Sequence, residues 1–188
     1  GLNLVTGFRP HEMDMFGLET IPRDQRYVMA TEFTEMMKRL WRDDANVTWD
    51  GDHWSLHDAY VSPKPTHGRP IMVSAGSSDA GIAYATQFSD LIFITSPGGA
   101  DICEALATLP ADTQHIRNFA ATRGRSISTV INPHVICRET EREVDEVCRA
   151  IVAAEDTGAV DGLMGTMTSG DQSSWRGHKR DQRIIGGN

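Results

Sequence analysis

The stretch IMVSAGSSDAG, residues 71–81, sets the fold class of this 188-residue chain. Its first five residues are small or apolar and predict a buried strand, while residues 79–88 predict a short helix. Between them stand Gly76, Ser77 and Ser78. Backbone N–H groups and hydroxyls at a helix N-terminus suit an anion such as phosphate, but the same residues also serve as a plain N-cap. The stretch alone leaves both interpretations open.

The alternation of strand and helix continues on both sides of this stretch. Strands are predicted at residues 1–5, 71–75, 90–96 and 127–138, and helices at residues 24–42, 79–88, 100–109, 111–123 and 140–156. The strands are apolar throughout, which favours burial on both faces and an α/β fold. Four such units fit half of an eight-unit barrel or a small doubly wound sheet, and both folds bind ligands at the carboxyl ends of their strands. The residues expected on that rim are 3–7, 76–78, 95–99 and those after Val135.

Two helix ends carry clear local signals. Gly124 predicts the end of the helix at 111–123, because glycine readily adopts the conformation that stops a helix. Thr140 and Glu143 have the spacing of a capping box, which predicts the start of the helix at 140–156.

Three segments depart from the strand–helix pattern. Residues 8–23 contain two prolines and a glycine and predict a long loop. Residues 43–70 predict an excursion made of a β-hairpin and a proline-rich connector. Residues 159–188 are polar and glycine-rich and predict an irregular insertion. We expect residues 1–188 to form one domain that is truncated at both ends, because the chain opens inside one predicted strand and closes on another.

Composition argues against several classes of protein. The formal net charge of −8 argues against nucleic acid as the main partner. No apolar run approaches the roughly 20 residues that a membrane span needs. The three cysteines are far apart and odd in number, which favours a reducing cytoplasm over a disulfide framework or a thiolate zinc site. His53 and His57 lie in hairpin-like sequence, where a spacing of four does not converge, so no metal site is predicted.

A few polar residues stand out near the predicted rim. Asn3 lies in an apolar strand, and a buried asparagine must form hydrogen bonds with neighbouring backbone or with a ligand. Glu12 follows in the loop, and Arg26 and Tyr27 begin a helix. Arginine binds phosphate or carboxylate in a bidentate manner, although an arginine at a helix start is also an ordinary surface residue. No recognisable nucleophile–base arrangement occurs and no catalytic residue is predicted, which favours a cofactor as the carrier of the chemistry.

Several of these pieces occur together in a familiar order. They are GLNLVTG (1–7), Glu12, RDQRY (23–27), WDGDHW (49–54), SPKP (62–65) and AGSSDAG (75–81). This ordered set resembles the bacterial-luciferase-like flavin monooxygenases, nearest to their pyrimidine, dimethylsulfone and alkanesulfonate monooxygenase branch. The likeness is strongest over residues 1–100 and looser over residues 127–158.

The resemblance implies a fold, a cofactor and residue roles. The fold would be a TIM barrel of which this chain holds about strands four to seven. The cofactor would be reduced FMN, supplied by a separate NAD(P)H:flavin reductase and used with O₂ to oxygenate a pyrimidine, a sulfone or an alkanesulfonate. The full-length protein would be a homo-oligomer. The residues that the resemblance places on the cofactor are Asn3 and Glu12 beside the flavin, Arg26 and Tyr27 as general cofactor contacts, and Ser77 and Ser78 at the phosphate.

Two alternatives remain open at this point. One is a deazaflavin-dependent dehydrogenase on the same barrel, which transfers hydride and does not activate oxygen. The other is a flavin-binding fragment without catalytic activity.

Overall fold

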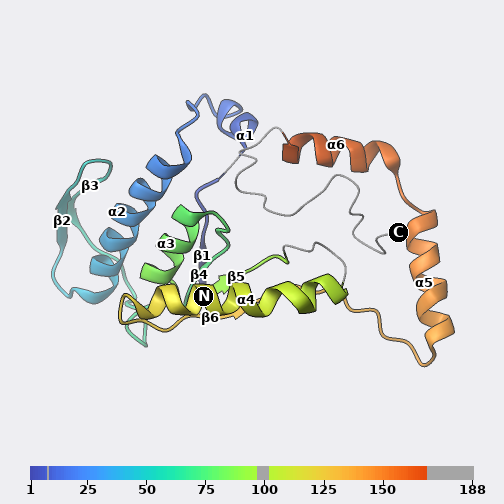
Figure 1. Cartoon of the computed structure of the whole chain (residues 1–188). Coiled ribbons are helices and arrows are strands. Elements are labelled where there is room, and N and C mark those ends of the chain that lie inside the picture. Colours follow the sequence, from blue (N-terminus) through green and yellow to red (C-terminus); the bar gives the residue numbers. More distant parts are fainter. Residues whose placement is uncertain (8, 97–101, 169–188) are drawn as a thin grey trace.

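The computed structural model describes residues 1–7, 9–96 and 102–168. Strands and helices alternate along this part of the chain (Figure 1). The elements are β1 (Leu2–Leu4), α1 (Pro10–Asp14), α2 (Arg23–Arg42), β2 (Val47–Asp50), β3 (Ser55–Ala59), β4 (Met72–Ser74), α3 (Asp79–Phe88), β5 (Leu91–Phe93), α4 (Ile102–Ala121), β6 (Ser128–Val130), α5 (Glu141–Ala153) and α6 (Thr157–Thr168).

The central sheet has four parallel strands in the order β1-β4-β5-β6. Every connection between neighbouring strands of this sheet contains at least one helix. This confirms the predicted parallel α/β arrangement. The core lies between the sheet and the helices α3 and α4. It is formed by side chains from α3, β5, α4 and the residue before β6, namely Ala85, Ile92, Ile116, Ala120 and Ile127.

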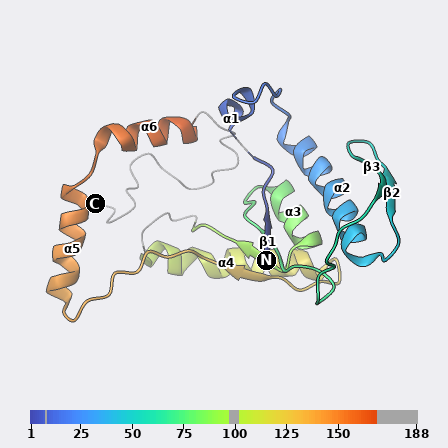
Figure 2. The same ribbon diagram turned by 180° about the vertical axis from the view of Figure 1, so that it is seen from behind.

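The opposite face of the sheet remains accessible. Val5, Ile71 and Phe93 are 68%, 56% and 41% exposed, whereas Met72 and Ile92, which alternate with them, are buried. The prediction that the strands are buried on both faces is therefore wrong for the described residues. The apolar composition of the strands correctly predicts apolar side chains on both faces of the sheet, but among the described residues helices pack against only one face. Helix α5 stands to one side of the sheet, and α6 runs from it back toward α1, so neither packs on the face of the sheet (Figures 1 and 2).

Helix α4 differs from the two helical pieces that the sequence predicts. It runs without interruption from Ile102 to Ala121, with Pro110 inside it. A proline removes one N–H and leaves the carbonyl four residues earlier without its usual partner. That carbonyl belongs to Leu106, an exposed residue, so water can satisfy it. Gly124, with φ of 66°, follows the end of the helix as predicted.

Three further predictions need correction. The strand predicted at 127–138 is limited to β6, which ends at Val130. The residues after Val135 are therefore several residues beyond the carboxyl end of β6 and do not belong to the rim of the sheet. The predicted loop 8–23 contains the short helix α1, which begins with Pro10, a favoured first residue of helices. The segment 159–188 begins inside α6, so residues 159–168 are not irregular, and residues 169–188 lie outside the described part.

Two local predictions are confirmed. The capping box starts α5, because Thr140 Oγ1 accepts from Glu143 N at 3.3 Å and Glu143 Oε2 accepts from Thr140 N at 3.0 Å. Strands β2 and β3 form the predicted antiparallel hairpin. The hairpin is attached to α2 by Glu32, whose carboxylate accepts from Trp49 Nε1 at 3.1 Å and from the backbone N–H of Trp54 at 3.0 Å.

An ion pair joins the amino ends of two central strands. Asp90 accepts two hydrogen bonds from Arg69, at 2.6 and 2.7 Å, and one from the backbone N–H of Met72, at 2.8 Å. The pKa of Asp90 is lowered, chiefly by the hydrogen bond from Arg69, against the opposing effect of partial burial. The ionised carboxylate is therefore favoured in the folded state.

Replacing Asp90 by asparagine is expected to lower the free energy of unfolding by about 1 kcal/mol at neutral pH, because solvent screens a pair that is a third exposed. A carboxyl group whose pKa is lowered by folding stabilises the fold above its unfolded pKa and loses that contribution as the pH falls through the folded pKa. The difference between wild type and Asp90→Asn should therefore shrink below about pH 4. Urea unfolding at pH 7 and pH 3 measures this difference. Asp44→Asn, which changes an exposed carboxylate, is the control. An Asp90→Asn effect of equal size at both pH values would contradict the lowered pKa of Asp90.

Candidate active site

A cavity of about 370 Å³ lies at the carboxyl ends of β1, β4 and β5. This is the edge at which parallel α/β folds bind their ligands. Its walls come from the ends of those strands, from α1 and from the start of α2. The lining residues are Leu4, Val5, Thr6, Gly7, Glu12, Arg23, Arg26, Tyr27, Ser74, Ala75, Gly76, Ser77, Ser78, Phe93 and Thr95.

The turn of Gly76, Ser77 and Ser78, called here the 76–78 turn, joins β4 to α3. Ser78 is the N-cap of α3, and its Oγ accepts from Gly81 N at 3.2 Å. The plain capping role is therefore present. It uses a lone pair of the hydroxyl oxygen and leaves the hydroxyl hydrogen as a donor. Ser78 is 4% exposed and also lines the cavity, so capping and ligand binding are compatible at this residue.

The 76–78 turn and the first turn of α3 approach closely. A Cβ on Gly76 would lie 2.7 Å from Gly81 Cα and 2.6 Å from the hydroxyl oxygen of Tyr27. A Cβ on Gly81 would lie 2.8 Å from Gly76 Cα and 2.7 Å from the same hydroxyl. Side chains at either position would overlap backbone, so both residues must be glycine for this geometry. The close approach fixes where the backbone N–H groups at the start of α3 lie.

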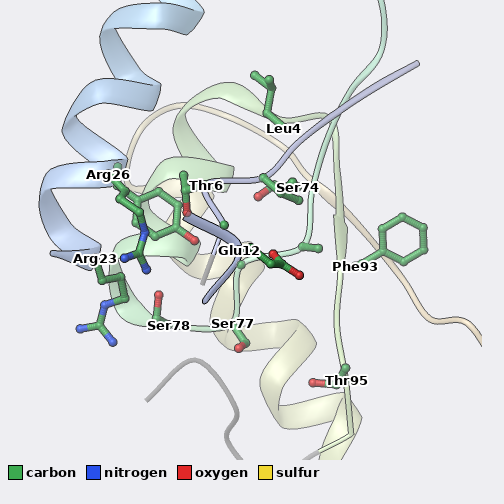
Figure 3. Close-up of a pocket in the computed structure, with 15 residues that line it drawn as sticks. Leu4, Thr6, Glu12, Arg23, Arg26, Ser74, Ser77, Ser78, Phe93 and Thr95 are labelled. Carbon is green, nitrogen blue, oxygen red and sulfur yellow. The ribbon is translucent and has the colours of Figure 1, made fainter. Parts of the chain in front are cut away.

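Two arginines of α2 reach the same end of the cavity. Arg23 and Arg26 are three residues apart and therefore lie on the same side of the helix. Figure 3 shows both guanidinium groups on the side of the cavity where Ser78 lies. Arg26 Nη1 donates to the carbonyl of Ile21 at 2.6 Å. Its Nε is buried and, among the described residues, has no hydrogen-bond partner. A buried donor without a partner is costly and therefore indicates a missing acceptor.

A carboxylate and an apolar wall complete the cavity. Glu12, from α1, forms an ion pair with Arg9 at 2.7 Å, and its side chain is about half exposed at the cavity. Leu4, Val5 and Phe93 line the cavity as well. Phe93 lies on the opposite side of Glu12 from the two arginines (Figure 3). The cavity therefore has a cationic end rich in N–H donors and an apolar end, which fits a ligand with an anionic group joined to a larger apolar body.

Comparison with known proteins assigns the chain to a family. A sequence profile described as luciferase-like monooxygenase matches residues 1–186. The chain belongs to the luciferase-like monooxygenase family. Relatives of this luciferase-like chain include the FMNH₂-dependent dimethylsulfone monooxygenase of Pseudomonas putida, 30% identical over 86% of the chain, and the pyrimidine monooxygenase RutA of Stutzerimonas stutzeri, 33% identical over 80% of the chain.

A solved structure supports the fold of the luciferase-like chain. The long-chain alkane monooxygenase LadA superposes with a TM-score of 0.76 at 23% identity, over 92% of the chain and 44% of LadA. The predicted luciferase-like α/β barrel fold is thus confirmed, with this chain forming part of it. The aligned part is 43% of the dimethylsulfone monooxygenase and 39% of this RutA, so the chain spans less than half the length of these two relatives.

The cavity of the luciferase-like chain brings together most of the residues singled out from the sequence. Glu12, Arg26, Tyr27, Ser77 and Ser78 all line it. Asn3 does not. It lies in β1 opposite Val73 and is exposed, so the prediction that it is buried is wrong. It shares the accessible side of the strand with Val5, two residues further on, which does reach the cavity.

Sequence reasoning gave no role to several side chains of this site, among them Arg23, Thr95 and Phe93. Arg23 carries a usable signal, because it lies one helical turn before Arg26 in the same RDQRY segment. The sequence places Thr95 on the predicted rim without a role, and it predicts Phe93 only as part of an apolar strand. Successive side chains of β5 point to opposite faces of the sheet. Phe93 can therefore be placed on the accessible face only once Ile92 is known to be buried.

Among the described residues, no three His, Cys, Asp or Glu side chains gather in a way that could hold a metal ion. In the same part of the chain, every helix is too short or too polar to cross a bilayer.

Proposed function

We propose that this protein is a flavin-dependent monooxygenase that uses reduced FMN and O₂ to oxygenate a small organic substrate. The observation that carries the proposal is the buried, unpartnered Arg26 Nε at a cavity that also holds the 76–78 turn. The names of the relatives at about 30% identity, FMNH₂-dependent dimethylsulfone monooxygenase and pyrimidine monooxygenase, support the same class of reaction.

The residues of the cationic end fit a phosphate monoester. Such a group carries nearly two negative charges and strong acceptor oxygens at neutral pH. Arg26 Nε, the Ser78 hydroxyl and the backbone N–H groups at the start of α3 are donors of the required kind. Arg23 adds a second positive charge on the same side. Ser77 lies in the same turn and is proposed as a further phosphate contact.

The rest of the cavity fits the remaining parts of FMN. Glu12 supplies acceptor oxygens for ribityl hydroxyls or ring N–H groups, and its Oε1 also accepts from Arg9 Nη1 at 2.7 Å. Tyr27 packs at the 76–78 turn, and Asn3 is proposed to lie beside the ring system. The apolar side chains of Leu4, Val5 and Phe93 offer an apolar surface against which the ring system can pack.

The chemistry of the reaction follows from this division of roles. Reduced FMN, when bound, supplies the electrons that activate O₂. The chain's own residues bind the phosphate and orient the ring end toward the accessible face of the sheet. We propose that reduced FMN comes from a separate NAD(P)H:flavin reductase and that the substrate is a pyrimidine, a sulfone or an alkanesulfonate. The three free cysteines support a reducing compartment, the cytoplasm.

Comparing FMN with riboflavin tests the proposal, because riboflavin lacks the phosphate. The dissociation constant of FMN should be at least about tenfold lower, since a charged hydrogen bond contributes about 1.5–3 kcal/mol. With reduced FMN and O₂ supplied, an oxygenated product should form from a sulfone, a pyrimidine or an alkanesulfonate. Equal affinity for FMN and riboflavin would overturn the proposal. The absence of an oxygenated product, combined with hydride transfer from an organic substrate to an oxidised deazaflavin, would favour the dehydrogenase alternative.

A further inference from the structure

The hydroxyl of Tyr27 touches the most sterically constrained part of the site. It lies against both Gly76 and Gly81, so close that a Cβ on either glycine would overlap it. Tyr27 belongs to α2, whereas the two glycines belong to the 76–78 turn and to α3. The position of α2 relative to α3 therefore decides whether Arg26 lies opposite the 76–78 turn.

A second contact joins the same two helices further from the cavity. Tyr84 Oη and Thr34 Oγ1 are 2.6 Å apart, in a buried hydrogen bond between α3 and α2. Thr34 Oγ1 also donates to the carbonyl of Ala30 at 2.7 Å. Since a threonine hydroxyl has one hydrogen, Tyr84 is the donor of the bond between the helices. Burial raises the pKa of Tyr84, which keeps this hydroxyl protonated.

The two contacts are connected through aromatic rings. The ring of Tyr84 packs against that of Tyr27, with centroids 5.7 Å apart, and against Phe88, at 5.1 Å. Tyr27 and Thr34 are seven residues apart, which places them two turns apart on one face of α2. Gly81 and Tyr84 are three residues apart on one face of α3. Two contacts separated along both helices fix their crossing better than either contact alone.

We propose that Tyr84, through its hydrogen bond to Thr34, is a positioning residue for the anion-binding end of the cavity. It holds α2 and α3 in the arrangement that places Arg26 opposite the 76–78 turn. Neither Tyr84 nor Thr34 lines the cavity, so both act through other residues. The inference rests on the proposed function, because it concerns the group that the 76–78 turn and Arg26 bind.

The test compares the affinities for FMN and riboflavin in matched variants. Tyr84→Phe keeps the ring and removes the donor, and we expect the dissociation constant of FMN to rise about fivefold with that of riboflavin unchanged. Thr34→Val removes the acceptor and should have the same effect. Thr34→Ser keeps the hydroxyl and should preserve the wild-type ratio of the two constants. Thr86→Val is the control, because the hydroxyl of Thr86 is also buried in α3 but donates only to Ile82 and Ala83 within that helix.

Each outcome decides the matter. A preference for FMN that falls about fivefold in Tyr84→Phe and Thr34→Val, with Thr34→Ser and Thr86→Val like wild type, supports the inference. An unchanged preference in both hydroxyl-removing variants, or an equal loss in Thr86→Val, overturns the inference and leaves the proposed function standing. A wild-type protein that does not prefer FMN to riboflavin overturns both. Melting temperatures of all four variants separate a change in overall stability, which lowers both affinities together, from a change at the phosphate end.

Discussion

Gly81→Ala is expected to lower the free energy of unfolding by about 2–3 kcal/mol. The added Cβ would lie 2.8 Å from Gly76 Cα and 2.7 Å from the Tyr27 hydroxyl. Tyr27 can turn away, but the backbone of Gly76 cannot move without displacing the 76–78 turn. The same change should therefore also weaken FMN binding. Urea unfolding gives the first quantity, and titration with FMN gives the second.

Gly162→Ala is the matched control for this prediction. Gly162 lies inside α6, and a Cβ there would meet nothing within 4 Å. Alanine favours helix over glycine by up to about 1 kcal/mol, so this variant should be as stable as wild type or more so. If Gly81→Ala were equally harmless, the close approach of the 76–78 turn to α3 would not constrain the site.

Arg26→Met is expected to raise the dissociation constant of FMN by about 10- to 100-fold, because a charged hydrogen bond to phosphate contributes about 1.5–3 kcal/mol. Methionine keeps much of the apolar stem and removes the charge and the buried Nε donor. The affinity for riboflavin, which has no phosphate, should change little. Fluorescence titration with both flavins measures the two constants in each variant.

Arg42→Met is the control for the arginine prediction. Arg42 ends the same helix, and its guanidinium pairs with Asp43 at 2.7 Å, away from the cavity lining. The variant should bind both flavins as wild type does. The phosphate assignment of Arg26 would be wrong if Arg26→Met weakened riboflavin as much as FMN, since the change would then act through the loop that Arg26 holds at Ile21.

Features that depend on neighbouring residues along the chain could be predicted. The turn from β4 into α3 follows from an apolar run that ends in a glycine and a capping serine, and Ser78 is indeed the cap. Thr140 and Glu143 mark the start of α5 for the same local reason. Because parallel strands place their carboxyl ends at one edge, the sequence also predicts that residues 3–7 and 76–78 meet there. Glu12 and Arg26 are assigned to the same site only through the family resemblance.

Features that depend on distant partners could not be predicted. The length of β6 is set by its pairing with the three residues of β5, whereas the apolar pattern continues to residue 138. Asn3 was expected to be buried, but burial depends on what covers the accessible face of the sheet. Pro110 suggested a helix break, yet the carbonyl it leaves unpaired is on the exposed Leu106. The approach of Tyr27 to Gly76 and Gly81 has no signal in any local window.

The central claim is that the 76–78 turn and Arg26 hold the phosphate of FMN. A crystal structure with FMN bound tests it most directly. We predict that the phosphate lies within hydrogen-bond distance of Arg26 Nε and of the Ser78 hydroxyl, with the ring end toward Phe93. Density for the phosphate at any other part of the molecule, with Arg26 Nε still unpartnered, would contradict the account.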